Sequence, residues 1–297
     1  MSIVLSIVAQ LLHVGLILLA APLLVGVLAI GPALLAGRAA PAFMQPWRDL
    51  VRLFRKQAMR AENASIVAHM APLAVTTLAA LSVCLVPSFA LGMVSAPLTD
   101  LMSLGALFVL ARTVRWLAAI DAGSGEGGVA AATAGGFAVV AEPALWLAVF
   151  ALSLLAGGGT LDRIVATRLD GTLLSGGGAA LAIASLAVLA WADSAALPIE
   201  GAYSGRDLAL LRIADALRLL AWCDLIGALA LPLGMASAEA GPLAWAVGLG
   251  AWVGRLLLTA LVLTAVRSMG LEHRMPAAAG LALLLGGIAA VLGGVHG

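Results

Sequence analysis

Residues 4–35 read VLSIVAQLLHVGLILLAAPLLVGVLAIGPALL and contain no charged side chain. An α-helix of about 20 apolar residues crosses the hydrocarbon core of a bilayer, where it satisfies its own backbone hydrogen bonds. The stretch therefore predicts a transmembrane helix. Further apolar stretches of spanning length follow it at residues 64–94, 98–120, 129–156, 176–197, 208–236, 242–268 and 276–295.

The composition agrees with eight helical spans in one membrane domain, residues 1–297. Hydrophobic residues make up 63% of the chain and charged residues 10%, whereas soluble proteins average about 25% charged residues. The mean hydropathy is +1.12. The alternating pattern of a transmembrane β-strand is absent. The sequence predicts an all-α integral membrane protein, and a net charge of +1 argues against nucleic acid as a partner.

Basic residues predict the orientation of the spans, because cytoplasmic loops carry an excess of Lys and Arg. The even-numbered connections hold only Arg163 and Arg168. The odd-numbered connections are therefore expected to face the cytoplasm, which places both termini on the outer side of the inner, cytoplasmic membrane. The basic residues in or at the edge of the odd-numbered connections are Arg38, Arg48, Arg52, Arg55, Lys56, Arg60, Arg112, Arg115, Arg206, Arg212, Arg267 and Arg274.

The first cytoplasmic loop, residues 36–63, is the most polar segment. Within residues 46–60, apolar side chains recur at helical spacing and basic side chains occupy the other face. Such a helix lies in the membrane interface and turns its basic groups toward phosphates or toward a partner protein, and the residues alone leave both readings open. The apolar positions are Trp47, Leu50, Val51 and Phe54, and the basic ones are Arg48, Arg52, Arg55 and Lys56.

The chain lacks the groups for metal or redox chemistry of its own. Two cysteines, Cys84 and Cys223, exclude a disulfide scaffold, a zinc finger and a cluster held by four cysteines of this chain. His13 and His69 fall near opposite faces of the membrane, so one haem cannot use both. The glycine-rich run at residues 123–128 follows no strand, which excludes a nucleotide-binding loop. We therefore expect no metal and no cofactor in this chain.

Ionisable residues within the spans are costly in lipid and usually mark a pathway or an ion pair. Glu142 lies near the middle of the fourth span without a partner nearby in the sequence. Arg212, Asp215 and Arg218 are spaced to pair along one helix face. We expect either a polar trail leading inward from the cytoplasm or a set of structural pairs. The charged residues of this trail are Glu142, Asp193, Glu200, Asp207, Asp215, Asp224 and Arg255.

Three motifs resemble a known family. The first is QPWRDLVRLFRKQ at residues 45–57, followed by ENAS at 62–65. The second is LAAIDAGSGEGGVAAATAGGFAVVAEP at 117–143, and the third is Leu197-Pro198 with Glu200, then YSGRDLALLRIADALR at 203–218. They resemble the membrane subunit shared by respiratory complex I and group 4 membrane-bound nickel–iron (NiFe) hydrogenases. The branch of formate hydrogenlyase subunit 4 and hydrogenase-4 component C is the most similar.

The resemblance implies a non-catalytic subunit that anchors a cytoplasmic arm. The expected partners are a NiFe hydrogenase-like large subunit, an iron–sulfur small subunit and antiporter-like membrane subunits, so the NiFe site and the iron–sulfur clusters would belong to partners. Glu142 and Glu200 correspond to positions of proton coupling. The residues implied to meet the arm are Gln45, Trp47, Arg48, Asp49, Arg52, Arg55, Lys56 and Asp121.

The chain departs from the family pattern after the glycine pair of the second motif. Relatives commonly read Ala-Ser-Arg-Glu there, whereas residues 131–134 read Ala-Ala-Thr-Ala. The resemblance therefore implies altered coupling, or a substitute charge such as Arg112, Arg115 or Asp215.

We interpret the sequence as the membrane-anchor and proton-coupling subunit of a formate hydrogenlyase-like complex. The alternatives are a quinone-site subunit of a complex I-type NADH dehydrogenase and a stand-alone ion transporter. A transporter would not need a specific basic docking helix.

Overall fold

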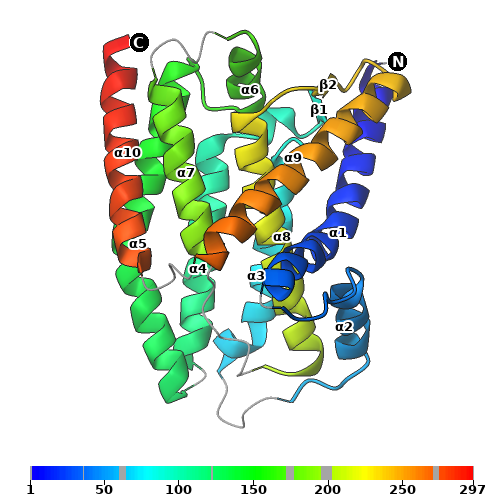
Figure 1. Ribbon diagram of the computed structural model, residues 1–297, viewed down its shortest axis with the longest axis vertical. Helices are drawn as coiled ribbons and strands as arrows, with labels where there is room; N and C mark the ends of the chain where they lie inside the picture. The colour runs from blue at the N-terminus through cyan, green and yellow to red at the C-terminus, as the bar shows by residue number, and fades with distance from the viewer. Residues whose placement is uncertain are drawn as a thin grey trace.

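The computed structural model describes residues 2–35, 37–59, 65–121, 123–171, 177–194, 203–269 and 274–296. Within these ranges the chain is almost entirely helical, and eight of its helices have 17 residues or more. They are α1 (Ser2–Leu35), α3 (Ile66–Leu85), α4 (Leu101–Asp121), α5 (Gly125–Leu155), α7 (Gly178–Ser194), α8 (Gly205–Ala230), α9 (Pro242–Ser268) and α10 (Met275–His296) (Figure 1).

Six of the described helices, α1, α3, α4, α5, α9 and α10, are long and apolar enough to cross a membrane. The helix α7 is apolar but short, and α8 carries six charged side chains. The chain is a multi-pass, all-α membrane protein, as the composition predicts. The number of eight spans stays a prediction for α7 and α8.

Two predicted spans are too long at their carboxyl ends. The stretch 64–94 becomes α3, which ends at Leu85, and the stretch 208–236 becomes α8, which ends at Ala230. In both cases the next residue precedes a proline, Pro87 or Pro232. The residue before a proline is sterically excluded from helical conformation, so the helix ends there although the apolar pattern continues.

The bundle has two distinct ends (Figure 1). The first helix begins and the last helix finishes at the same end, which we call the terminal end. The short helix α2 (Gln45–Phe54) lies at the opposite end, which we call the α2 end. This arrangement agrees with termini on one side of the membrane and the first loop on the other.

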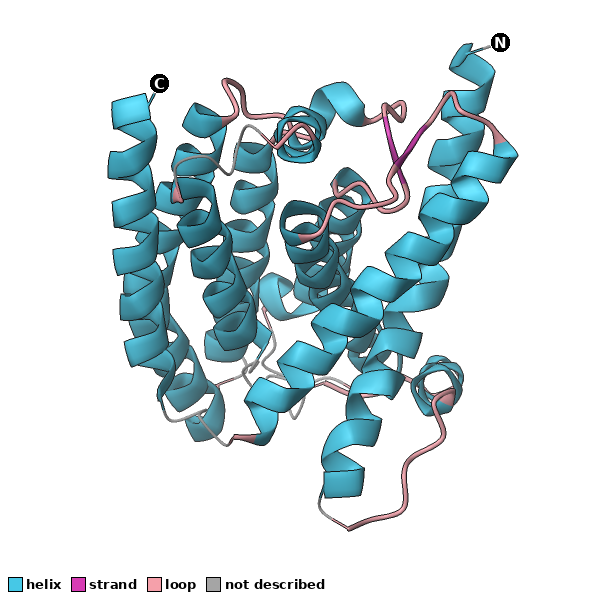
Figure 2. Ribbon diagram, turned by 45° about the horizontal axis from the view of Figure 1, so that its top comes forward, coloured by secondary structure: helices cyan, strands magenta, loops and turns pink. Residues whose placement is uncertain are grey.

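The terminal end contains structure that apolar periodicity does not reveal. The strands β1 (Ala90–Leu91) and β2 (Ala236–Ser237) form a parallel pair between the loops that follow α3 and α8 (Figure 2). A 3₁₀ turn, η1 (Ala96–Leu98), and a short helix, α6 (Leu161–Leu169), complete this end. The guanidinium of Arg168 in α6 donates to the backbone carbonyls of Leu229 and Ala230 at the end of α8, where helices leave carbonyls unpaired.

A half-buried carboxylate, that of Asp162, fixes α6 to the loop after β1. The backbone N–H of Gly92 donates to Oδ2 of Asp162 at 2.6 Å. Burial raises the pKa of Asp162, and the hydrogen bond from Gly92 partly opposes that rise. Both effects belong to a structural loop contact far from α2.

The second sequence motif forms the turn between α4 and α5. Oδ2 of Asp121 accepts hydrogen bonds from the backbone N–H groups of Ser65 and Ala68 and so caps the start of α3. Ser124 caps α5 by accepting from the N–H of Gly127. A Cβ on Gly127 would lie 2.5 Å from the carbonyl oxygen of Ala119. These residues therefore hold three helix ends together.

Small residues in the last helix allow close packing, as small residues commonly do in membranes. A Cβ added to Gly286 of α10 would lie 3.1 Å from the carbonyl oxygen of Ala144 in α5. Helix α10 contacts both α5 and α7. It covers the side of the bundle away from α1 and α9 (Figure 1).

Candidate functional site

Charged side chains from four helices meet inside the bundle. We call this group the central ionic cluster. It joins three guanidinium groups and three carboxylates through contacts of 3.9 Å or less. Its members are Arg112 and Arg115 of α4, Glu142 of α5, Asp193 of α7, and Asp215 and Arg218 of α8.

Asp193 is the centre of the cluster. Its Oδ1 accepts from Nε and NH2 of Arg112 at 3.3 and 3.1 Å. Its Oδ2 accepts from NH1 of Arg218 at 2.8 Å and from the indole Nε1 of Trp222 at 2.9 Å. Both oxygens of the buried carboxylate are therefore saturated by donors from α4 and α8, and Phe108 stacks on Trp222 at 4.4 Å between ring centroids.

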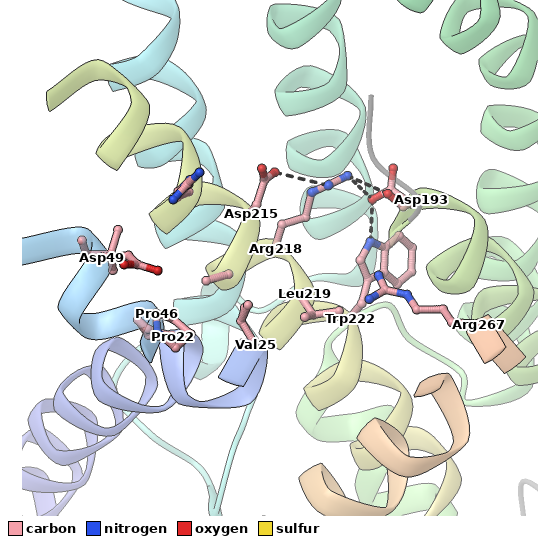
Figure 3. A pocket seen from close by; sticks show the side chains of 13 residues that line it. Pro22, Val25, Pro46, Asp49, Asp193, Asp215, Arg218, Leu219, Trp222 and Arg267 are labelled. Atoms are coloured by element: carbon pink, nitrogen blue, oxygen red, sulfur yellow. Dashed lines mark hydrogen bonds and ion pairs between the residues drawn. The ribbon is translucent and has the colours of Figure 1, made fainter. Parts of the chain in front are cut away.

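Asp215 links the cluster to the α2 end. It accepts from NH1 of the buried Arg115 and lies 3.4 Å from NH2 of Arg218. The pairing of Asp215 with Arg218 on one face of α8 confirms the spacing argument. In Figure 3 the side chain of Arg218 reaches from Asp215 to Asp193.

Glu142, which has no partner nearby in the sequence, gains one from another helix. Its Oε1 lies 3.9 Å from NH1 of Arg112, thirty positions earlier in the chain. Its side chain is 29% exposed, and Pro143 beside it is exposed. Arg112 thus contacts Asp193 on one side and Glu142 on the other. The cluster reaches the surface of α5 at Glu142.

The prediction that Arg112 and Arg115 lie at the edge of the third connection is wrong. Both lie within α4 and are buried, at 9% and 4% exposure. Counting basic residues to predict orientation assigns every arginine near the end of a span to a loop. These two arginines instead form ion pairs with Asp193 and Asp215 inside the bundle. The role of substitute charges that the departure from the family pattern implies for them stays a prediction.

A cavity of about 410 Å³ lies between the cluster and α2. Pro22 and Val25 of α1 and Leu219 of α8 give it an apolar wall, while Pro46 and Asp49 bring α2 to its mouth (Figure 3). Asp193, Asp215, Arg212, Arg218 and Arg267 supply its polar lining. The cavity therefore joins the surface of α2 to the centre of the ionic cluster.

The predicted helix at residues 46–60 is shorter than expected. It begins at Gln45, with Pro46 in its first turn, and ends at Phe54. Proline is tolerated in the first turn of a helix because the N–H that it lacks would be unpaired there. Arg55 caps the helix, and the chain then leaves it.

The two faces of α2 differ from the predicted division. Leu50 is buried and Trp47 donates to the carbonyl of Leu19 in α1. Val51 and Phe54, predicted on the same apolar face, are 48% and 41% exposed. Arg48, Arg52, Arg55 and Lys56 are exposed as predicted. The surface of α2 away from the bundle is therefore both basic and apolar.

The other predicted docking residues are engaged within the chain. Nε2 of Gln45 donates to Oδ1 of Asp49, and NH1 of Arg52 lies 3.5 Å from the same oxygen. Asp121 caps α3, as described above. These contacts fix the shape of the α2 end and leave the arginines as the groups that face outward.

The segment after α2 is attached to the start of α8. The N–H of Met59 donates to Oγ of Ser204 at 2.8 Å, and that hydroxyl donates to the carbonyl of Met59. Gly205 has a φ of +55°, and a Cβ there would collide with the carbonyl oxygen of Gln57. Sequence reasoning did not find this contact, because it joins two segments about 145 positions apart.

Two further predicted coupling residues, Asp207 and Asp224, lie toward the two ends of α8. Asp207 is buried in the first turn of α8, and Asp224 is buried toward its other end. Glu200 lies outside the described residues. The structure thus brings together Glu142, Asp193 and Asp215, and places Asp224 in separate surroundings.

The bundle and its internal charges define a polytopic membrane protein with a buried ionic network. A family model described as NADH dehydrogenase matches residues 7–283, so the chain belongs to that family. Formate hydrogenlyase subunit 4 of Escherichia coli (strain K12) is 25% identical over 188 residues, which cover 63% of this chain and 61% of that protein.

The fold also occurs in a solved complex. A chain in the structure of the membrane-bound sulfane sulfur reductase, an archaeal respiratory membrane complex, matches with a TM-score of 0.74. The two chains are 17% identical, and the match covers 96% of this chain and 98% of that one. At this identity the likeness concerns the fold.

Proposed function

We propose that the chain is the membrane-anchor and proton-coupling subunit of a multi-subunit, formate hydrogenlyase-like complex. It docks a soluble arm on α2 and transmits the effect of the arm's redox reaction to ion translocation in the membrane. The chain itself catalyses no reaction. Family membership and the similarity to formate hydrogenlyase subunit 4 support this assignment.

The observation that carries the proposal is the continuous series of ion pairs in the central ionic cluster. From the cavity beside α2, the series runs through Asp215, Arg218 and Asp193 to Arg112 and then to Glu142. Buried ion pairs contribute little net stability. A series of them from the cavity beside α2 to a partly exposed carboxylate supports a coupling role, because moving one proton or one charge would change every pair.

The exposed ends of the series suggest where partners bind. The α2 end faces the cytoplasm and receives a NiFe hydrogenase-like large subunit and an iron–sulfur small subunit. Glu142, on the surface of α5, faces an antiporter-like membrane subunit, because a partly exposed carboxylate is costly against lipid. The termini then lie on the outer side of the inner, cytoplasmic membrane.

Charge reversal on α2 tests the docking function. We expect Arg48→Glu, Arg52→Glu and Arg55→Glu together to detach the arm from purified membranes, while the chain still inserts. A single charge at the rim of an interface mainly affects the rate of association, so three charges are reversed together to produce a measurable loss of binding. Co-purification of the arm with affinity-tagged chain measures the loss.

Two controls accompany this experiment. Replacing the same three arginines by lysine keeps the charge and should keep most of the arm. Arg38→Glu changes an exposed charge in the same loop but outside α2 and should have no effect. Undiminished recovery of the arm with the triple glutamate variant would show that α2 is only a lipid-surface helix.

The cavity supports a second candidate, a quinone-site subunit of a complex I-type NADH dehydrogenase. Its volume of about 410 Å³ lies within the usual range of small-molecule sites. Its apolar wall and charged end suit a molecule with a lipid tail and a polar head. A photoreactive quinone analogue that labels α1 or α8 in competition with unlabelled quinone would favour this candidate, and absence of labelling would oppose it.

A further inference from the structure

A second group of buried polar side chains lies in the half of the bundle nearer the terminal end. We call it the far cluster. It joins α1, α8 and α9 to the loop after α3, and every member is less than one tenth exposed. Its members are His13, Ser88, Asp224, Trp252 and Arg255.

The contacts of the far cluster are short. Nδ1 of His13 lies 2.7 Å from Oγ of Ser88, and NH2 of Arg255 donates to the backbone carbonyl of Ser88. The indole Nε1 of Trp252 donates to Oδ1 of Asp224 at 2.7 Å. The charge of Arg255 also acts on Asp224. Arg255 therefore connects the two halves of the far cluster, His13 with Ser88 and Asp224 with Trp252.

Two polar atoms of the far cluster lack a hydrogen bond. Oδ2 of Asp224 and Nε2 of His13 are buried, and neither makes a hydrogen bond of normal geometry with any residue that the structure describes, although the backbone carbonyls of Val83 and Cys84 face the His13 ring. An unsatisfied buried atom of this kind carries the full desolvation penalty of its polar group. If these side chains served stability alone, we would expect every polar atom to be hydrogen-bonded, or apolar side chains to stand in their place. The two unsatisfied atoms, Oδ2 of Asp224 and Nε2 of His13, therefore indicate that a small polar species binds next to them.

The chemistry of the cluster favours a proton with ordered water over a metal cation. Arg255 already places a positive charge beside Asp224 and occupies the carbonyl of Ser88. A metal ion would have to compete with that guanidinium. Imidazole and carboxylate are instead the side chains that exchange protons most readily near neutral pH.

We propose that Asp224 and His13 form a proton-binding site, bridged by ordered water, that continues the charged series of α8 toward the terminal end. A proton from bulk water adds to Oδ2 of Asp224, passes along ordered water to Nε2 of His13 and is released to bulk water at the terminal end. One proton enters and one leaves, and no other bond is broken. The site goes beyond the coupling function proposed above, which ends at Glu142.

The position of Asp224 on α8 supports this continuation. Asp224 follows Arg218 by six residues, or about 9 Å along a helix axis. The groups that face Asp224 are Arg255 and Trp252 of α9 and the neighbouring thiol of Cys223. The groups that face His13 are Ser88 and the backbone carbonyls of Val83 and Cys84 at the end of α3. Among these groups, only Arg255 carries a fixed charge.

Infrared difference spectroscopy of the purified full-length chain at varied pH tests the proposal. The parent should show a protonated carboxyl band that exchanges slowly in heavy water, and Asp224→Asn should remove the intensity of one carboxyl. His13→Gln should shift the midpoint or frequency of the same band. Glu239→Gln, in an exposed loop, should affect only a rapidly exchanging carboxyl.

Identical spectra from the parent and Asp224→Asn would overturn the proposal, since Asp224 would then stay ionised beside Arg255. Should Asp224→Asn fail to fold, an unshifted band in His13→Gln would do the same. This readout needs no soluble arm. If the protonated carboxyl band is lost in Asp224→Asn but Glu142→Gln still couples normally, only the proposed function is refuted. If the spectra are identical but Glu142→Gln loses coupling, only this inference is refuted.

Discussion

Asp193 shows how one residue organises the charges of the bundle. Its two oxygens accept from guanidinium groups of α4 and α8 and from the indole of Trp222. Removing one partner of a buried ion pair leaves an uncompensated charge. Here arginines of α4 and α8 would lose their common partner, so we expect the loss of this carboxylate to weaken the contacts among α4, α7 and α8.

The first prediction concerns that carboxylate. Asp193→Ala should lower the free energy of unfolding by about 3–5 kcal/mol, the usual cost of breaking a buried pair. Asp193→Asn should be milder, because its amide oxygen still accepts a hydrogen bond. Thermal unfolding in detergent measures both. Asp170→Ala, at an exposed position, is the control, and an unchanged midpoint for Asp193→Ala would contradict the central ionic cluster.

At the scale of residues, local spacing predicts local pairs and nothing more. The three-residue spacing of Asp215 and Arg218 predicts their contact, which the structure confirms. Glu142 appears lone in the sequence because its partner, Arg112, is on another helix. Single-sequence patterns carry no information on which helices are neighbours.

At the scale of elements, α2 is linked to α8. Through this link, the proposed docking of an arm on α2 would affect the central ionic cluster. The hydrogen bonds between Met59 and Ser204 tie the segment after α2 to the first residues of α8. That helix then carries Asp215 and Arg218. A displacement of α2 would therefore reach the charged series through the backbone as well as through the cavity.

The second prediction tests this link. Gly205→Ala should destabilise the chain, since φ is +55° there and a Cβ would collide with Gln57. A left-handed conformation alone costs an alanine about 1–2 kcal/mol. Proteolysis of the segment after α2 should also become faster. Gly254→Ala, in open space within α9, should be neutral or stabilising. Equal behaviour of the two variants would show that the close contact is absent.

Among the elements, the apolar helices and α2 were predictable and the terminal end was not. Apolar length identifies spans because lipid requires it, and helical spacing identifies α2. The helix α6 has nine residues and a mixed face, and each strand of the β pair has two residues. Such short elements exist because other loops pack against them, which periodicity does not record.

At the scale of the whole molecule, the fold places the amphipathic helix α2 at one end and two groups of buried polar side chains inside the bundle. The third prediction concerns cofactors. Cys84 lies in α3 and Cys223 in α8, and no group of metal ligands occurs among the described residues. The chain purified without partners should hold no haem and no iron–sulfur cluster. Optical spectra and iron analysis measure this, and stoichiometric iron would contradict the subunit assignment.

The central claim is that the ionic cluster couples the arm to ion translocation through Glu142. Gln keeps the shape of that side chain but cannot ionise. The most direct measurement compares proton translocation with dye-linked hydrogenase activity in the reconstituted complex, for the parent, Glu142→Gln and the exposed-loop control Glu239→Gln.

We predict that Glu142→Gln leaves the complex assembled and its dye-linked activity near that of the parent, while proton translocation per turnover falls severalfold. The control variant should match the parent in both assays. Unchanged translocation in Glu142→Gln would contradict the account, and so would a complex that falls apart, because Glu142 would then hold helices or subunits together without relaying protons.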